Sequence, residues 1–407
     1  MQESATAGIL VAFRIRSFRF QFCADLVVAW AIEMEVIILA WYILTATDSP
    51  FLLALLGALR FGGTLLSPLV GAYADRISRK RLLLCIRLSF TALALVLMAF
   101  ALHDAVTPLA VFAVVTIAGL LRPADMMLRQ SLIADTVGPS ILTNALAFSR
   151  MTVDSARMFG ALAGAGLMAA LGLANAYIIV TVLYLASTLL TLFIQSGQRP
   201  APASVARPFA ELREGIMLLR DARALRHILY LAFLVNLTVL SITGGLLPLV
   251  ARDIYGLDSL GLGVMAATFA GGALIGSLLT ATLMRRFDPE RLMFRCAILW
   301  HLLMAMYTQI DSANIGIPML AVIGLVSSFV MVPMASCLLR RTPIDFRGRI
   351  MGLRQLAVFG LPLGLLCSGV FIEWTSVATA LCSYSLGGAV FTFFLWRSWR
   401  TGELAQA

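Results

Sequence analysis

Apolar runs of about 20 residues recur along almost the whole sequence, and they constrain its fold more than any other feature. Each run is long enough to cross a hydrocarbon core about 30 Å thick as an α-helix. Of the 407 residues, 60% are hydrophobic and only 13% are charged, whereas about a quarter of the residues of an ordinary soluble protein are charged. The sequence therefore predicts an all-α membrane protein and excludes a soluble one.

Twelve such runs can be counted, and a polar segment divides them into two sets of six. They are Phe20–Thr45, Phe51–Ala74, Leu82–Leu102, Pro108–Leu128, Leu142–Leu171, Asn175–Ile194, Ile228–Val250, Leu260–Leu283, Leu292–Ile310, Gly316–Leu339, Ile350–Ile372 and Val377–Trp396. The polar segment has a Pro/Ala-rich stretch followed by an amphipathic stretch that carries arginines. We therefore predict a six-helix bundle at 1–194, a cytoplasmic linker with a short surface helix at 195–226, and a second bundle at 227–407.

Basic residues collect in alternate loops, which predicts the orientation in the membrane. Loops on the other side contain Asp48, Asp104, Asp311 and Glu373, with Arg252 as their only basic residue. Because basic loops stay in the cytoplasm, both termini and the linker are expected there. We expect the protein itself in the inner membrane of a bacterium. The same asymmetry accounts for the net charge of +10, so we expect no nucleic-acid partner.

The two halves of the sequence resemble each other. A basic loop follows the second run of each half, at 75–84 and at 285–294. The fifth run of each half contains a Gly-xxx-Gly pattern, Gly160/Gly164 and Gly360/Gly364, and small residues at that spacing let helices approach closely. Parallel six-helix repeats with a substrate site at their interface are a known transporter design. The pattern predicts two pseudo-symmetric six-helix bundles.

Signatures of enzymes and metal sites are missing from the sequence. The six cysteines occur singly, without metal-ligand spacing. The sequence contains no nucleophile constellation, nucleotide-binding loop or HExxH motif. We therefore expect no enzymatic activity, no metal and no cofactor.

The segment GAYADRISRKRLLL at 71–84 resembles the signature loop of the major facilitator superfamily, G-x-x-x-D-R-x-G-R-[KR]. The matching residues are Gly71, Asp75, Arg76, Arg79 and Lys80. Ser78 stands where the second glycine is usual. The loop lies between the second and third runs, as in that family. A gating role for this loop is expected, in which Asp75 accepts hydrogen bonds from amides at the start of the eleventh run, near 349–352.

Three further stretches are similar to an exporter branch of that superfamily, which includes enterobactin-type siderophore exporters and macrolide-efflux relatives. They lie at 44–61, 119–135 and 346–355. The exporters' glycine-proline signature is only partly present, because Ala161 stands where proline is typical. The resemblance implies twelve helices in two bundles around a central cavity, alternating access, and a monomer surrounded by membrane lipids.

Ionisable residues inside the predicted membrane helices are concentrated in the first half. Such groups cost several kcal/mol each and usually face a cavity or one another. They are Glu33, Glu35, Arg60, Arg122, Asp125, Arg150, Asp154 and Arg157. At about 100° per residue, Glu33 and Glu35 point to nearly opposite faces of one helix. One of them is expected to face the cavity, and the other a neighbouring helix, paired to Arg60 or to an arginine of the fifth run.

Proton coupling is the role predicted for the acids of the first run. A carboxylate in the membrane can carry a proton, because desolvation favours its neutral form and a nearby cation favours its charged form. Glu33 with Arg122 is the preferred coupling pair by resemblance, since exporters of this superfamily use a first-helix acid and a fourth-helix arginine. Glu35 and Asp125 are further candidates.

Structural roles are predicted for other charges of the first half. Arg150, Asp154 and Arg157 are spaced i, i+4, i+7 and can satisfy one another along one stripe. Asp25, near the cytoplasmic end of the first run, is expected to be structural. Arg87, about one and a half turns inside the cytoplasmic boundary, is expected to extend its head group to the interface, as Arg354 is.

The second half carries polar rather than charged residues in its membrane helices. Asn236, Thr238 and Ser241 of the seventh run are expected to bind substrate, together with Trp30 and Met34 of the first run. His301 is expected to be a neutral packing residue.

These features together predict a secondary active transporter: a proton-coupled exporter of a small organic solute, either a siderophore-like metabolite or a drug. Its partners would be that solute, protons and membrane lipids. Uptake or facilitated diffusion of a small solute is one alternative, and a non-transporting membrane sensor on the same scaffold is another. Acids at mid-membrane favour transport, because a purely structural scaffold has little reason to bear their desolvation.

Overall fold

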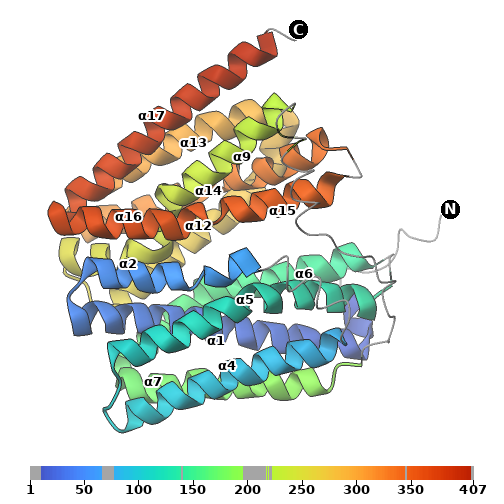
Figure 1. The fold of residues 1–407 in the computed structure, drawn as a ribbon, viewed down its shortest axis with the longest axis vertical. Helices are drawn as coiled ribbons and strands as arrows, with labels where there is room; N and C mark the ends of the chain where they lie inside the picture. Colours follow the sequence, from blue (N-terminus) through green and yellow to red (C-terminus); the bar gives the residue numbers. More distant parts are fainter. Residues whose placement is uncertain are drawn as a thin grey trace. The chain divides into compact units, whose positions relative to one another are not determined.

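The computed structural model describes residues 11–66, 78–138, 141–195, 217, 219, 222–343 and 346–404. Across these residues the regular structure is helical and includes no strand (Figure 1). The all-α fold predicted from the sequence is confirmed. Gly71, Asp75 and Arg76 of the signature loop, and most of the 195–226 segment, lie outside the described residues.

The first half begins with a short 3₁₀ turn, η1, and a long helix, α1. Its elements are η1 (Val11–Arg14), α1 (Arg16–Thr47), α2 (Pro50–Leu59), η2 (Gly62–Leu66), α4 (Arg79–Leu102), α5 (Pro108–Thr136), α6 (Leu142–Ser155), the π-helical turn η3 (Ala156–Gly160) and α7 (Ala161–Leu192). The side chains of Ser49 and Thr107 cap α2 and α5, and a proline follows each cap. Both pairs start a helix where the chain re-enters the membrane.

A break inside α7 separates two membrane crossings. Gly172 has φ 73° and ψ 179°, a backbone conformation that a residue with a Cβ rarely adopts. It falls between the fifth and sixth predicted runs, which end at Leu171 and begin at Asn175. The chain therefore turns at the place that the apolar pattern indicates.

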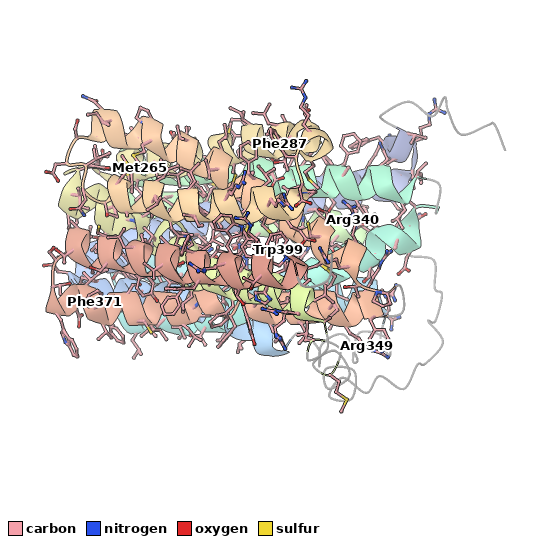
Figure 2. All side chains as sticks on the ribbon, turned by 90° about the horizontal axis from the view of Figure 1, so that it is seen from above. Met265, Phe287, Arg340, Arg349, Phe371 and Trp399 are labelled. Carbon is pink, nitrogen blue, oxygen red and sulfur yellow. The ribbon has the colours of Figure 1, made fainter. Side chains whose placement is uncertain are left out.

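The second half has a more interrupted first crossing. Its elements are α9 (Arg223–Leu237), α10 (Val239–Ser241), the π-helical turn η4 (Ile242–Leu246), α11 (Leu247–Leu249), the π-helical turn η5 (Val250–Ile254), α12 (Ser259–Arg286), α13 (Pro289–Tyr307), α14 (Ala313–Arg341), α15 (Arg347–Ala357), α16 (Gly360–Trp374) and α17 (Val377–Leu404). Figure 2 shows Arg340 and Arg349 towards one end of these helices, and Met265 and Phe371 towards the other. The first two belong to loops predicted to be cytoplasmic.

Nine helical segments of the described chain are long and apolar enough to cross a membrane. One of them, Asn144–Leu192, contains the break at Gly172. A shorter apolar helical segment covers Pro50–Thr64, and α13 adds a helix of 19 residues. The protein therefore crosses the membrane many times, and its helices are consistent with twelve crossings.

Packing groups the helices into two compact units. The first unit comprises Met1–Tyr42 and Leu65–Ala206, and the second comprises Ile43–Thr64 and Arg207–Ala407. In the first unit, α4 packs against both α5 and α7 (Figure 1). In the second, α14 packs against α12 and α13. The grouping differs from the sequence halves at Ile43–Thr64, because α2 packs closely on α16.

The Gly-xxx-Gly patterns make the same kind of contact in both units. Gly160 and Gly164 lie against the backbone of α1 at Trp30 and Met34. Gly360 and Gly364 lie against the backbone of α9 at Phe233 and Leu237. In each case two glycines four residues apart face two residues four apart on the first long helix. The predicted close approach of helices at these glycines is confirmed.

Replacing Gly164 with alanine is expected to lower the free energy of unfolding by about 1–3 kcal/mol, as overpacking of a tight contact does. A Cβ at Gly164 would lie 2.7 Å from the Cα of Met34, and backbone cannot swing away as a flexible side chain can. Gly387→Ala is the matched control, because nothing lies within 4 Å of a Cβ at that position in α17. Thermal unfolding in detergent, followed by circular dichroism, measures both variants; equal melting temperatures would contradict the prediction.

Candidate functional site

The first unit contains an ion pair between α1 and α5. Nη2 of Arg122 donates a hydrogen bond to Oε1 of Glu33 at 3.1 Å. The two side chains are 33% and 18% exposed, respectively, so the pair is accessible in part. The structure thus brings together the two residues that the sequence analysis prefers as a coupling pair.

The π-helical turn η3 brings a second guanidinium group close to Glu33. Gly160, which ends this turn, lies against the Cβ of Glu33 and the backbone of Trp30. Arg157 of the same turn interacts electrostatically with Glu33 and with Asp154. A π-helical turn inserts one extra residue into a helix and often marks a functional site. Here it places a second cation next to the Glu33–Arg122 pair.

Of the predicted stripe of Arg150, Asp154 and Arg157, only Arg150 and Asp154 form a direct ion pair among the contacts that the structure describes. Nε of Arg150 contacts Oδ2 of Asp154 at 3.1 Å, with the Arg150 side chain 60% exposed. Arg157 interacts with Asp154 as well but also reaches Glu33 of α1. The stripe therefore connects to the acid of the first helix instead of satisfying only itself.

Glu35 faces a different helix from Glu33 and has different partners. Tyr177 donates to Oε1 of Glu35 at 2.5 Å, and Tyr184 donates to Oε2 at 2.7 Å. Both tyrosines belong to α7 and are buried. The opposite orientation of the two acids, predicted from the helical repeat, is confirmed. The sequence analysis did not select these two tyrosines.

Arg60, the other predicted partner, ends α2 and belongs to the second unit. Its guanidinium carbon lies 6.0 Å from the centroid of the Phe61 ring.

Four buried charged side chains connect α1, α4 and α5. Arg87 is hydrogen-bonded to Oδ1 of Asp25, and its Nε lies 3.4 Å from Asp125. Nε of Arg129 lies 3.3 Å from Asp25, and its Nη1 lies 3.8 Å from Asp125. We call Asp25, Arg87, Asp125 and Arg129 the buried quartet. With two charges of each sign it is neutral, which makes its burial tolerable.

Polar neighbours complete the buried quartet. Arg87 donates to Oγ1 of Thr191 at 2.6 Å, and Arg129 donates to Oγ1 of Thr152 at 3.2 Å. Gln21 donates to the backbone carbonyl of Arg129 at 2.9 Å. These contacts involve α6 and α7 as well, so the quartet lies at the junction of five helical segments.

The buried quartet corrects one prediction and relocates another. Arg87 was expected to reach the membrane interface, and this is wrong, because its side chain is 1% exposed and meets two acids inside the unit. Asp125 was a candidate for proton coupling, and the structure places it among these ion pairs. Arg129 was missed because it lies one residue beyond the predicted end of the fourth run, whereas α5 continues to Thr136.

The polar residues predicted to bind substrate in the second half surround a break in the seventh crossing. Thr238 has φ −104° and ψ −91°, outside the helical region. Asn236 donates to the carbonyl of Ala232 at 2.8 Å, Thr238 to that of Leu234 at 2.7 Å, and Ser241 to that of Thr238. All three side chains are buried. In this conformation each of the three side chains donates to a backbone carbonyl three or four residues earlier in the chain.

His301 supports the same break from α13. Its Nε2 lies 2.8 Å from Oγ1 of Thr238, and its Nδ1 lies 2.7 Å from the carbonyl oxygen of Ala297. The residue is fully buried. The structure shows His301 packed in the interior, as the sequence analysis expects.

The remaining predicted contact residues of the first run differ in accessibility. Met34 is buried, and its backbone lies beneath Gly164, so it forms part of the packing between α1 and α7. Trp30 is half-buried and stacks on Phe159 of the π-helical turn, with ring centroids 6.3 Å apart.

Two residues of the signature loop lie at the start of α4 and contact neighbouring helices. Nη1 of Arg79 pairs with Asp135 at 2.7 Å, and Nζ of Lys80 donates to the carbonyl of Leu192 at 2.8 Å. They tie the start of α4 to the ends of α5 and α7. No three His, Cys, Asp or Glu side chains among the described residues are grouped to hold a metal ion.

Comparison with known proteins gives one family and one fold. A sequence model of the Major Facilitator Superfamily matches residues 22–366. No protein of curated function matches the chain.

Solved structures share this fold at low sequence identity. The POT family transporter PepTSo has a TM-score of 0.77 at 14% identity, over 95% of this chain and 99% of its own. The nucleoside transporter NupG has a TM-score of 0.73 at 14% identity, over 95% and 98%. A bacterial homologue of the iron transporter ferroportin, in an inward-facing state, has a TM-score of 0.72 at 16% identity, over 94% and 98%. At such identities the similarity shows the fold alone.

Proposed function

The chain belongs to the Major Facilitator Superfamily, and from that premise we propose that it exports a small organic solute across the cytoplasmic membrane in exchange for protons. The transporter would act as a monomer by alternating access, with both termini in the cytoplasm. The similarity of 44–61, 119–135 and 346–355 to siderophore and macrolide exporters supports this direction of transport.

The Glu33–Arg122 ion pair is the observation that carries the proposal. A carboxylate in a membrane helix is costly, and this one is not sealed inside the packing, since 18% of its side chain is exposed. The positive charges of Arg122 and Arg157 attract it. A proton that binds to Glu33 removes that attraction, so protonation changes the interaction between α1 and α5.

Exchange follows if the solute binds the charged form of Glu33. A carboxylate accepts hydrogen bonds from hydroxyl or amine groups about twice as strongly as a neutral acceptor does. A proton that enters from the outer side neutralises Glu33, weakens those hydrogen bonds and releases the solute there. Solutes rich in hydroxyl or amine donors, such as siderophore-like metabolites and many drugs, fit this requirement.

Comparison of solute accumulation between cells with and without the gene tests the proposal. A deletion strain is expected to retain an exported metabolite, or to accumulate more of a toxic compound, and the wild-type gene should reverse this. Reconstitution in proteoliposomes with an imposed pH gradient then measures whether solute moves against protons. Lower accumulation in the deletion strain would indicate uptake, and no difference for any compound would favour a membrane sensor; either result contradicts the proposal.

A further inference from the structure

Glu35 lies two residues from Glu33 on α1 but in a different chemical setting. Glu33 meets the guanidinium of Arg122, whereas Glu35 accepts hydrogen bonds from the phenols of Tyr177 and Tyr184. We propose that Glu35, Tyr177 and Tyr184 form a second proton-binding site that gains and loses a proton while keeping its hydrogen bonds. The inference rests on the proposed function in that it adds a proton site to a proton-driven transporter.

The partners of the two acids differ in what they can accept. A guanidinium has five N–H donors and no acceptor, whereas a phenol can donate one hydrogen bond and accept others. When Glu35 is charged, each phenol donates to one carboxylate oxygen, as the structure shows. When a proton forms an O–H bond on Glu35, that hydroxyl can donate to one phenol oxygen while the other phenol still donates. Both protonation states of Glu35 are therefore hydrogen-bonded.

Protonation of Glu33 has a different consequence. A neutral Glu33 no longer attracts Arg122, so the arginine is left with its charge uncompensated by this acid. Protonation there therefore loosens a contact between α1 and α5. Protonation of Glu35, by contrast, keeps its two hydrogen bonds to α7, because each phenol can also accept a hydrogen bond. The geometry separates a site that stores a proton from one whose proton changes a helix contact.

Burial makes the two tyrosines selective partners for this role. Tyr177 is 1% exposed and Tyr184 is 3% exposed, so water does not replace Glu35 as their partner from outside. A buried phenolic O–H usually finds a hydrogen-bond partner. The ring of Tyr184 is held against Phe90 of α4, with centroids 5.9 Å apart. The hydroxyl groups are therefore held in place while the proton on Glu35 comes and goes.

Charged groups near this site come from α5. Tyr184 interacts electrostatically with Arg122 and Asp125 as well as with Glu35. Arg122 also pairs with Glu33, so the same arginine interacts with Glu33 and with a phenol that holds Glu35. The two sites are thereby linked through Arg122, and we expect their protons to bind in separate steps.

Infrared difference spectroscopy of the full chain in lipid nanodiscs tests this inference with the proton as the only ligand. Protonated carboxyl groups absorb separately from charged ones, so a pH titration shows each acid as it takes up a proton. The other acidic residues of the chain contribute equally to the wild type and to the variants, so the difference between their titrations isolates one acid. Glu35→Gln is expected to remove one titrating band from the wild-type spectrum, and Glu33→Gln another.

The tyrosine variants decide whether the phenols belong to the proton site. Tyr184→Phe keeps the ring but removes one donor to the charged carboxylate. It is expected to raise the titration midpoint of the Glu35 band by about one pH unit, a tenfold gain in proton affinity. Tyr177→Phe is expected to act in the same direction. Tyr42→Phe, which removes a hydrogen bond from Tyr42 to the carbonyl of Val106, is the matched control and should leave the band in place.

Two outcomes overturn the inference. If Glu35→Gln removes no titrating band while the variant melts like the wild type, Glu35 stays charged and only satisfies two buried tyrosines. If Tyr184→Phe leaves the Glu35 midpoint unchanged, the phenols are not part of the site. Neither outcome changes the Glu33 band. The proposed function is therefore tested separately, by the response of Glu33→Gln and by the measurement of proton-driven transport.

Discussion

Replacing Arg87 with leucine is expected to lower the free energy of unfolding by about 3–5 kcal/mol, as removal of one partner from a buried ion pair does. Arg87 and Asp25 are each 1% exposed, so water cannot compensate for the lost charge. The variant leaves Asp25 and Asp125 with Arg129 as the remaining cation of the quartet. Denaturation of the purified protein in detergent, followed by circular dichroism, measures the change.

Matched variants separate the buried charge from charge in general. Arg150→Gln removes an arginine from an ion pair on α6 whose arginine is 60% exposed, and it is expected to cost less than about 1 kcal/mol. Arg87→Lys keeps the charge but has all its donors on one nitrogen, whereas Arg87 meets Asp125, Thr191 and Asp25 through three different nitrogens, so an intermediate loss is expected. If Arg87→Leu were as stable as Arg150→Gln, the quartet would not hold the first unit together.

The boundaries of the membrane helices explain why Arg129 of the buried quartet escaped the sequence analysis. An apolar run ends where charge begins when that charge faces lipid headgroups or water. In α5 the helix continues past Leu128, because Arg129 meets acids from α1 and from its own helix. Hydropathy along one helix contains no information about charges on its neighbours. Pairing within the bundle could therefore not be predicted from the run itself.

The polar residues of the seventh crossing show a related ambiguity. Serine, threonine and asparagine in an apolar run can bind a solute or can satisfy a broken backbone, and their sequence pattern is the same in both cases. Thr238 and Ser241 donate to backbone carbonyls at the break in this structure. The neighbouring glycines, Gly244 and Gly245 in the π-helical turn η4, were the available sign of an irregular helix.

The acids of the first run were predictable to different degrees. Glu33 and Glu35 are two residues apart on one helix, and the helical repeat alone places such residues on nearly opposite faces. Arg122 could be named as the partner of Glu33 only through the resemblance to exporters that use a first-helix acid and a fourth-helix arginine. Tyrosines are common in membrane helices and carry no charge, so nothing in the sequence marked Tyr177 and Tyr184, spaced i, i+7 on α7, as partners of Glu35.

Replacing Glu33 with glutamine is expected to abolish proton-driven accumulation while solute still moves down its own gradient. Each exchanged proton lets a pH gradient of one unit support about a tenfold solute gradient. Glutamine keeps an acceptor oxygen for the solute but cannot bind a proton, so the accumulation ratio should fall from about ten to about one. Proteoliposomes loaded with the solute identified in the deletion strain measure both the ratio and the downhill exchange.

Asp253→Asn is the matched control for this experiment, because it removes a partly exposed carboxylate that is paired with Arg252 and lies in the second unit. It should retain the proton dependence. Arg122→Gln should also lose coupling, and the Glu33→Gln, Arg122→Gln double variant should lose little more than either single variant, since the two residues act as one pair. Accumulation by Glu33→Gln that still follows the proton gradient would remove Glu33 from the coupling mechanism. In that case the phenol-held carboxylate of Glu35, which keeps hydrogen bonds in both protonation states, would be the acid on α1 left to carry the proton.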